Sequence, residues 1–222
     1  MAAAFCAEHI AQRYGRREIL TDCTIEADRG ECIGIAGRNG SGKSTFLQII
    51  AGGRRPAGGV IRYEGKEMHT DPGRISRIAA YVPQHNPLIE ELTAEQNLQL
   101  MSGRKVSSED PVCRKLKIDE FFRMKVASLS GGMKRRLAIA CALTEHQTIL
   151  VMDEPTSALD LYHKAIIYDY LKDYTKSGGI VVMATHDIEE MTLCDRLYLI
   201  TGGISEVCLP EEAIQKIKGV QL

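Results

Sequence analysis

The sequence has no hydrophobic run that approaches the roughly 20 apolar residues needed to cross a lipid bilayer. Residues 1–7 are mildly apolar, but Glu8 and His9 interrupt them and no basic residues precede them. A secretory signal combines a basic start with a longer apolar segment, so we expect no such signal here. The absence of both features predicts a cytoplasmic chain without a membrane span of its own.

An excess of charge of one sign is also missing. The 28 Lys and Arg residues nearly balance the 29 Asp and Glu residues, which gives a formal net charge of −1. A basic field would favour nucleic acid as a partner, and an acidic tail would favour a solvated extension, but the sequence has neither. We therefore expect no nucleic-acid partner.

Cysteine motifs are absent although the chain contains seven cysteines. Their number is odd, no two of them form a C-x-x-C pair, and several lie in apolar runs, where cysteine acts as a small hydrophobe. This usage favours reduced, buried thiols in a cytosolic protein over a disulfide framework or a zinc site.

The chain is organised around a glycine-rich segment, residues 37–45, with the sequence GRNGSGKST. It fits the pattern G-x-x-x-x-G-K-[ST], in which glycines bring backbone N–H groups close to phosphate oxygens. In that pattern Lys43 reaches the β and γ phosphates, and the Ser44 hydroxyl holds Mg²⁺. A buried strand at 33–36 and a following helix at 46–50 are the expected context. The alternative, a glycine-rich turn with a solvated lysine, does not account for that context.

The N-terminal part of the chain predicts β-structure over residues 5–36. Residues 28–31 predict a hairpin-like turn before the strand that leads into the phosphate loop. Another hairpin is expected around 60–66, and a further strand at 78–82.

Two side chains in this part have both a functional and an ordinary interpretation. Tyr14 either stacks on a nucleotide base or is a half-buried strand tyrosine. Gln84, at the end of the strand at 78–82, either offers an amide oxygen to a metal or water, or makes a common loop hydrogen bond.

The composition changes over residues 86–128, where charge rises and regular apolar runs fade. Residues 92–98 predict a helix start with Thr93 as its N-cap. We predict a small helical subdomain, from about residue 86 to about residue 145, inserted into an α/β core formed by residues 1–85 and 146–222 of a single domain.

Residues 129–133, LSGGM, form a second special segment that precedes a helix. Ser130 is a good N-cap, and the two glycines leave backbone N–H groups open at the positive helix end. The segment lacks the lysine and the metal-binding hydroxyl of the first loop. It is therefore suited to complete a phosphate site, although taken alone it would be an ordinary capped helix.

Residues 149–154 form an apolar run that ends in two acids, Asp153 and Glu154. A continuous apolar strand in a parallel sheet ends at the ligand crevice, and acids there are costly unless they meet a cation or a polar substrate. We expect Asp153 near Mg²⁺ and Glu154 near a water. The alternative is a solvated acid pair.

The rest of the chain continues the α/β pattern. A helix with its apolar stripe at 167–174 and a buried strand at 180–184 lead to His186, at the end of that strand, where it is placed to sense a γ-phosphate. A final strand at 196–200 and one short helix complete the expected elements.

These motifs together resemble the ATP-binding cassette (ABC) family. Residues 37–45 are similar to its Walker A loop, 129–133 to its signature motif, and 149–154 to its Walker B strand. The Q-loop glutamine would be Gln84, the D-loop Ser157 to Asp160, and the switch histidine His186. The match covers nearly the whole chain, and the signature followed by basic residues is its most discriminating part.

One position departs from the family pattern, because the signature often ends in glutamine and this chain has Met133 there. Any polar role of that side chain is lost, while Ser130 to Gly132 remain.

The resemblance implies a fold, a set of ligands and residue roles. The fold is a P-loop NTPase α/β core with a parallel sheet, an N-terminal antiparallel β subdomain and an inserted α-helical subdomain. Lys43, Glu154 and His186 would be catalytic, and Mg²⁺ would be held by Ser44, Asp153 and Gln84. The implied ATP-binding residues are Tyr14, which would stack on adenine, and Gly37, Asn39, Gly40, Ser41, Gly42, Lys43, Ser44 and Thr45.

The resemblance also implies partners. Two cassettes, either copies of this chain or different ones, would form a head-to-tail dimer in which Ser130, Gly131 and Gly132 contact the ATP of the other protomer. A separate transmembrane permease subunit would hold the dimer at the cytoplasmic face of the membrane. The alternative is a non-transport ABC ATPase of a soluble assembly complex, of the iron–sulfur scaffold type.

Overall fold

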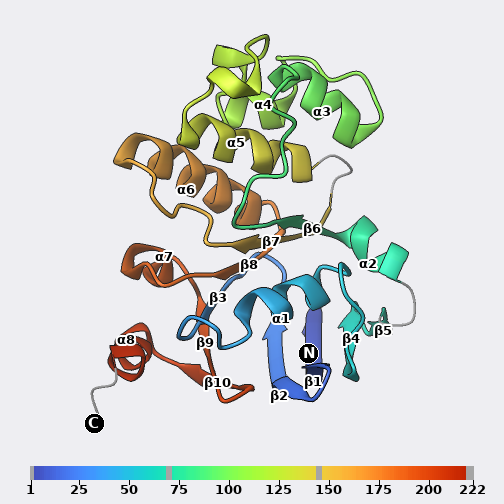
Figure 1. The fold of residues 1–222 in the computed structure, drawn as a ribbon, viewed down its shortest axis with the longest axis vertical. Coiled ribbons are helices and arrows are strands. Elements are labelled where there is room, and N and C mark those ends of the chain that lie inside the picture. Colours follow the sequence, from blue (N-terminus) through green and yellow to red (C-terminus); the bar gives the residue numbers. More distant parts are fainter. Residues whose placement is uncertain (1–2, 69–71, 144–146, 219–222) are drawn as a thin grey trace.

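The computed structural model describes residues 3–68, 72–143 and 147–218 (Figure 1). The described strands form one mixed, curled sheet in the order β5-β4-β1-β2-β10-β9-β3-β8-β7-β6. The strands are β1 (Phe5–Tyr14), β2 (Arg17–Ala27), β3 (Cys32–Ala36), β4 (Gly58–Tyr63), β5 (Lys66–Glu67), β6 (Ala79–Val82), β7 (Ile149–Asp153), β8 (Ile180–Ala184), β9 (Arg196–Thr201) and β10 (Ile204–Cys208).

Parallel strands form the centre of the domain. β3, β7 and β8 are buried along their whole length, as expected for strands that helices cover on both faces. β8 lies between β3 and β7, and β6 pairs with the outer side of β7. Because these strands run in the same direction, their last residues, Ala36, Val82, Asp153 and Ala184, come to one edge of the sheet.

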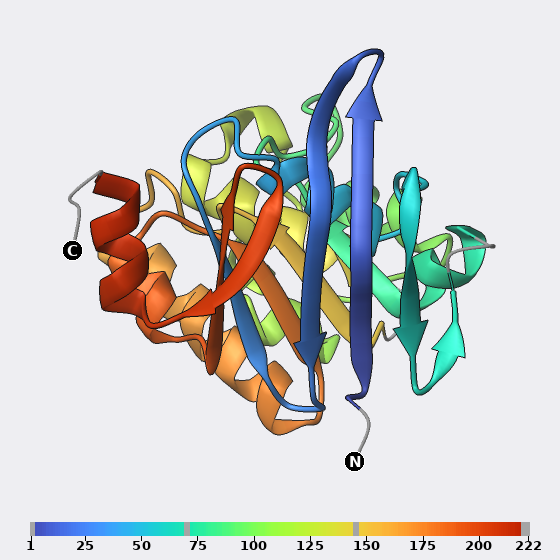
Figure 2. The same ribbon diagram turned by 90° about the horizontal axis from the view of Figure 1, so that it is seen from below.

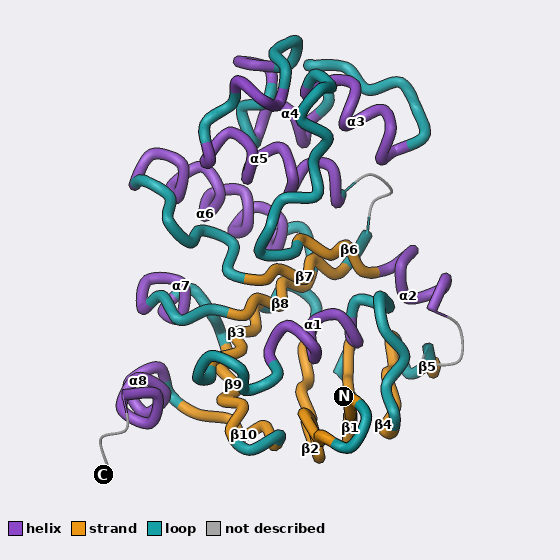
Figure 3. The backbone as a smooth tube through the Cα atoms, viewed as in Figure 1, coloured by secondary structure: helices purple, strands orange, loops and turns teal. Residues whose placement is uncertain are grey.

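Helices pack on both faces of these strands (Figures 1 and 3). α1 (Lys43–Ile50) lies inside the curl, where Phe46 and Leu47 are fully buried against side chains of both the antiparallel and the parallel strands. α5 (Gly131–Ala142) and α6 (Leu161–Lys176) cover the opposite face. α7 (Ile188–Thr192) and α8 (Pro210–Lys218) pack against β9.

The antiparallel strands β1, β2, β4 and β5 form a separate end of the sheet (Figure 2). The predicted hairpin around 60–66 is confirmed, since β4 pairs with β5 through Arg62–Glu67 and Tyr63–Lys66. All seven cysteines are free, as predicted, and all but Cys194 are buried.

The inserted helical segment lies at the end of the molecule away from these antiparallel strands (Figure 1). It contains α3 (Ala94–Ser102), α4 (Pro111–Lys115), the 3₁₀ turns η1 (Asp119–Phe121) and η2 (Val126–Ser128), and α5. The predicted N-cap is confirmed, because Thr93 Oγ1 accepts the Gln96 N–H at 3.2 Å and Gln96 Oε1 accepts the Thr93 N–H at 2.9 Å. The predicted boundary at residue 145 lies outside the described residues.

Two predictions about the topology were wrong. The turn at 28–31 does not close a hairpin, because β2 pairs with β1 and β10 while β3 pairs with β8 and β9. The fully buried β3 needs buried neighbours on both sides, which the half-exposed β2 cannot provide. The strand at 196–200 is not the last, since β10 returns antiparallel to β9 after Gly202 and Gly203. The helices α2 (Pro72–Ile78) and α7 were not anticipated.

Candidate nucleotide site

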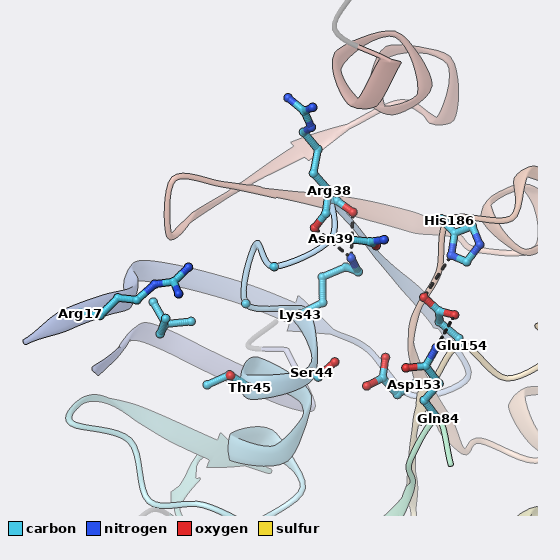
Figure 4. Close-up of a pocket in the computed structure, with 14 residues that line it drawn as sticks. Arg17, Arg38, Asn39, Lys43, Ser44, Thr45, Gln84, Asp153, Glu154 and His186 are labelled. Carbon is cyan, nitrogen blue, oxygen red and sulfur yellow. Dashed lines mark hydrogen bonds and ion pairs between the residues drawn. The ribbon is translucent and has the colours of Figure 1, made fainter. Parts of the chain in front are cut away.

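A pocket of about 960 Å³ lies at the edge of the sheet where the parallel strands end (Figure 4). In open α/β sheets this edge is where ligands bind. The pocket brings together the phosphate loop, Gln84, the two strand-end acids and His186, as the sequence predicted. Its lining residues are Arg17, Ile19, Gly37, Arg38, Asn39, Gly40, Gly42, Lys43, Ser44, Thr45, Gln84, Asp153, Glu154 and His186.

The phosphate loop connects β3 to α1 and leaves backbone donors free. Gly42 has a φ of 103°, a left-handed conformation that glycine adopts without a steric penalty. The bond from the Phe46 N–H to the Gly42 carbonyl, 2.9 Å long, opens the helix, so the N–H groups of the first turn have no partner inside it. The buried Ser41 hydroxyl also lacks a hydrogen-bond partner among the described residues. Such free donors at a helix N-terminus fit a phosphate group.

Lys43 places a cation beside these donors. Its side chain is only 7% exposed, and Nζ donates to the carbonyls of Gly37 at 2.8 Å and Arg38 at 3.2 Å (Figure 4). Burial lowers the pKa of Lys43, while the negative charges of Glu154 and Asp153 oppose that shift. A phosphate on the free N–H groups would therefore lie next to a lysine whose position the loop already fixes.

Ser44 and Asp153 supply oxygen donors in the same pocket. Asp153 is the last residue of β7 and is 5% exposed, and Ser44 is exposed in the first turn of α1. Mg²⁺ prefers such oxygens together with substrate phosphates. Among the described residues no group of three or more His, Cys, Asp or Glu side chains is suited to a metal. The donor set thus fits a Mg²⁺ that is bound together with a nucleotide.

Glu154 stands at the centre of a hydrogen-bonded triad. Its Oε2 accepts from Gln84 Nε2 at 2.9 Å, and its Oε1 lies 3.1 Å from His186 Nδ1 (Figure 4). Its φ of 46° is uncommon for a residue with a side chain, and such conformations concentrate at functional sites. The structure places Gln84 on Glu154, so the role of Gln84 toward a metal stays a prediction.

Tyr14 lies beside the phosphate loop but outside the pocket lining. Its hydroxyl is 3.4 Å from Thr45 Oγ1, and the Arg54 guanidinium carbon lies 4.8 Å from the centre of its ring. Arg17 and Ile19, which the sequence analysis did not single out, line the pocket instead. Stacking of adenine on Tyr14 stays a prediction.

The signature segment does not line the pocket either. Ser130 caps α5, and its Oγ accepts the Met133 N–H at 3.2 Å, as the sequence predicted. Ser130 and Gly131 are exposed, whereas Gly132 lies against His163, where a Cβ would approach the imidazole Cδ2 to 1.9 Å. The chain therefore exposes Ser130 and Gly131 to solvent, and neither residue lines its own phosphate pocket.

Met133 has a structural explanation. Its side chain is half-buried and packs against the apolar cluster that joins the helical segment to the sheet. At this position the chain thus uses the side chain for packing, which an amide would do less well.

A buried carboxylate near the site was not predicted from the sequence. Glu190 of α7 is 1% exposed, and its Oε1 accepts from the Thr156 N–H at 3.0 Å and the Thr156 hydroxyl at 2.5 Å. Burial raises the pKa of Glu190, while hydrogen bonds from Thr156 and Thr185 oppose the shift. These bonds hold the loop that follows Glu154. No local pattern marks Glu190, because its partner is 34 residues away.

The loop, the acids and the histidine define a P-loop nucleotide-binding protein, and comparison with known proteins gives the family. A sequence profile of the ABC transporter family matches residues 20–157. Nod factor export ATP-binding protein I of Rhizobium etli is 33% identical over 204 residues, which cover 88% of this chain and 65% of that protein. The chain spans less than two thirds of the length of the first curated relatives that it matches.

Solved structures agree with this result. The structure of an ATP-binding subunit of an ABC transporter is 26% identical, with a TM-score of 0.81 over 98% of this chain and 94% of that one. The dimeric structure of MJ0796, a bacterial ABC transporter cassette, is 30% identical, with a TM-score of 0.79 over 91% and 96%. The chain belongs to the ABC transporter family, and the solved structures that it resembles are ATP-binding cassettes of that family. Within the described residues, no helix combines the length and the apolar character that a membrane span requires.

Proposed function

We propose that this chain binds and hydrolyses MgATP as the ATP-binding subunit of an ABC transporter. One observation carries the proposal. Lys43, the neighbouring Asp153 and Glu154, and His186 come from three separate parts of the sequence and line one pocket, and these residue types supply the charge and positioning on which phosphoryl transfer depends.

The phosphate loop would hold the substrate. ATP would lie with its β and γ phosphates on the free N–H groups at the start of α1, where Lys43 neutralises their charge. Ser44 and Asp153 would hold Mg²⁺, with Gln84 assisting. When bound, this ion supplies positive charge that stabilises the transferring phosphoryl group.

Glu154 would act as the general base on the attacking water. Gln84 and His186 each engage one of its carboxylate oxygens, which fixes the orientation of the group. A carboxylate offers about four lone-pair sites, so both oxygens keep capacity to accept the proton of a water. His186, whose side chain is 58% exposed, would contact the γ-phosphate from the same side.

A second cassette would complete the site. This chain presents the Ser130 hydroxyl and the exposed Gly131 outward, and neither lines its own pocket. In a head-to-tail dimer, these groups and Gly132 would reach the ATP on the phosphate loop of the partner. The dimeric structure of MJ0796, which the chain matches over 91% of its length, supports a second copy as that partner.

A membrane-spanning permease would receive the motion of the dimer, at the cytoplasmic face of the membrane. Support comes from exposed apolar side chains on the helical segment: Ile89 is 42% exposed, Leu100 58%, Met101 48% and Met124 42%. Asn97 accepts from the Ile89 N–H at 2.9 Å and donates to its carbonyl at 3.0 Å, which fixes this segment on α3. The segment begins shortly after Gln84 in the chain, which would connect a partner bound there to the site.

The competing role in a soluble assembly complex is not supported by the relatives. The Rhizobium etli protein is named for Nod factor export, and the similar solved cassettes are named for ABC transporters. Transport is therefore the function that the comparisons favour.

The variant Glu154→Gln tests the proposal. It keeps the phosphate loop but removes the base, so purified variant protein with excess MgATP should form a dimer that retains nucleotide, as measured by light scattering and by nucleotide content. Wild-type protein under the same conditions is the control and should turn over the ATP. A variant that stays monomeric and retains no nucleotide would contradict the proposal.

A further inference from the structure

Two neighbouring arginines on α5 are buried and have no role in the function described so far. Arg135 is 4% exposed and Arg136 is 1% exposed. A buried arginine is costly unless its donors are satisfied, so the acceptors of each guanidinium show what it holds in place.

Arg135 is directed toward the strand ends that carry the site. Its guanidinium has five N–H donors, and the structure provides five oxygen acceptors for them. Four are backbone carbonyls and one is a side-chain amide oxygen: Nε donates to Pro155 O at 2.8 Å, Nη2 to Asp153 O at 2.8 Å and Glu154 O at 3.2 Å, and Nη1 to Pro83 O and to Asn86 Oδ1 at 3.2 Å.

These acceptors flank the groups that act on the substrate. Pro83 precedes Gln84 at the end of β6, and the other three carbonyls belong to the end of β7 and the two residues that follow it. One of them belongs to Glu154 itself, whose backbone has the uncommon positive φ. A change in the position of Arg135 would therefore move Glu154 and Gln84 together.

Arg135 also keeps its positive charge in this buried position. Burial lowers the pKa of Arg135 to about 10, while the acids Glu190, Asp153 and Glu154 oppose the shift, so the group is protonated at neutral pH. Among the described residues, no carboxylate lies within ion-pair distance of it. Its charge is satisfied by carbonyl dipoles, which depend on the planar, forked shape of the guanidinium.

Arg136 is directed elsewhere. Its Nη1 donates to Leu116 O at 3.1 Å and Lys117 O at 3.4 Å, and its guanidinium carbon lies 5.1 Å from the centre of the Phe121 ring. These three residues belong to the helical segment, as does Glu120, whose Oε2 lies 3.7 Å from Nη1, and the Tyr162 ring of α6 lies 6.0 Å from the guanidinium carbon. Arg136 is therefore a control of the same residue type, on the same helix and with similar burial, and among the described residues it makes no contact with the strand ends.

We infer that Arg135 is a positioning residue for ATP hydrolysis, which sets Glu154 and Gln84 by tying the signature helix α5 to the ends of β6 and β7. The inference rests on the hydrolysis proposed above. It also gives a physical link between the two functional ends of the chain, because Ser130 and Arg135 belong to one short helix and a displacement of that helix reaches the carboxylate.

The variants Arg135→Lys and Arg136→Lys test the inference. Lysine keeps the positive charge but lacks the planar, forked set of N–H donors of the guanidinium. For Arg135→Lys we expect kcat to fall by about 10- to 100-fold, because small displacements of reacting groups have effects of this size. The affinity for MgATP should change by less than about threefold, since the phosphate loop is untouched. For Arg136→Lys we expect a lower melting temperature and a kcat, per folded protein, within about threefold of wild type.

A double-mutant cycle with Glu154→Gln separates positioning from general stability. If Arg135 acts through Glu154, Arg135→Lys slows the wild type but adds little to the residual rate of Glu154→Gln. An equal slowing in both backgrounds would overturn the inference, as would equal losses of kcat for the two lysine variants. If Arg135→Lys does not fold, Asn86→Ala, which removes only one acceptor, should still lower kcat at unchanged affinity, and an unchanged kcat would overturn the inference.

Amide hydrogen exchange distinguishes failure of the inference from failure of the proposed function. In protein without nucleotide, Arg135→Lys should speed exchange at the amides of Gln84, Glu154 and Thr156, whereas Arg136→Lys should speed it within the helical segment and at the start of α6, where Tyr162 lies. If wild-type protein hydrolyses no ATP, the proposed function fails. If the wild type is active but both variants show the same exchange pattern, the positioning role fails alone.

Discussion

The start of α1 and the start of α5 are both glycine-rich helix N-termini, but they differ in the side chains that surround them. The α1 end contains a buried lysine, opens into a pocket of about 960 Å³ and faces two strand-end acids. At the α5 end Ser130 and Gly131 are exposed, the nearby Lys134 is paired with Glu90 at 2.6 Å, and the LSGGM segment lines none of that pocket. Free helix N–H groups attract an anion at both ends, and among the described residues only the first end combines them with a buried lysine and with oxygen donors suited to a metal.

The caps of the two helices show the same difference. The N-cap of α1 is Gly42, which has no side chain to occupy the N–H groups of the first turn. The N-cap of α5 is Ser130, whose oxygen already accepts the Met133 N–H, so its hydroxyl hydrogen remains to be donated to a ligand. The first end is suited to hold a phosphate group alone, and the second to add donors to a phosphate group that is already held.

Among the changes that test this comparison, loss of Lys43 should have the largest effect on ATP hydrolysis and on the affinity for MgATP. Lys43→Met removes the cation of the first end, so we expect hydrolysis to fall by about 100- to 1000-fold, as for other groups that stabilise transition-state charge. The affinity for MgATP should weaken by at least about tenfold, since a charged hydrogen bond is lost. Titration of nucleotide into the purified variant and a phosphate-release assay measure both quantities. Wild-type affinity in the variant would contradict the assignment.

Removal of the signature hydroxyl should affect hydrolysis but not binding. In Ser130→Ala we expect hydrolysis to fall by about 10- to 100-fold while a single chain binds MgATP as well as wild type. Thr93→Ala is the matched control, because Thr93 caps α3 in the same way. Each variant should lose about 1 kcal/mol of stability through its lost cap. Equal hydrolysis in the two variants would mean that Ser130 is only a cap.

The smallest expected effect is a dependence of protein stability on pH. It arises from Glu190, which is buried. Its pKa in the folded protein is raised above the ordinary value of 4.5, so the folded state holds the proton more tightly than the unfolded state. The free energy of unfolding should therefore fall as pH rises from 4.5 to the folded pKa, by at most about 1.4 kcal/mol per pH unit.

The variant Glu190→Gln should lose this slope while it keeps an oxygen for Thr156. Urea unfolding at a series of pH values measures the effect. Glu91→Gln, which changes an exposed acid of the helical segment, should leave the slope unchanged. An unchanged slope in Glu190→Gln would show that this carboxyl does not titrate differently in the two states.

The sequence predicted the groups whose positions follow from local rules. Lys43 and Ser44 are fixed by the spacing of one loop, and Asp153 and His186 by the ends of buried strands that must lie at one edge of the sheet. The chain order alone does not give strand neighbours, so the local pattern at 28–31 predicts a hairpin although β2 and β3 are not paired.

Other features were missed because they depend on contacts between distant segments. Arg135 binds a carbonyl 52 residues before it, and Glu190 binds a residue 34 positions before it. No periodicity or short motif records such pairs, and both lie next to the site that the motifs did predict.

The most direct test of the shared site mixes two inactive variants. Lys43→Met damages the phosphate loop and leaves the signature intact, while Ser130→Glu places a negative charge in the signature and leaves the loop intact. In a mixed dimer one composite site carries both changes and the other carries none. An equal mixture should therefore recover about a quarter of wild-type hydrolysis although each variant alone is nearly inactive. A mixture no more active than its components would contradict a site shared between two copies.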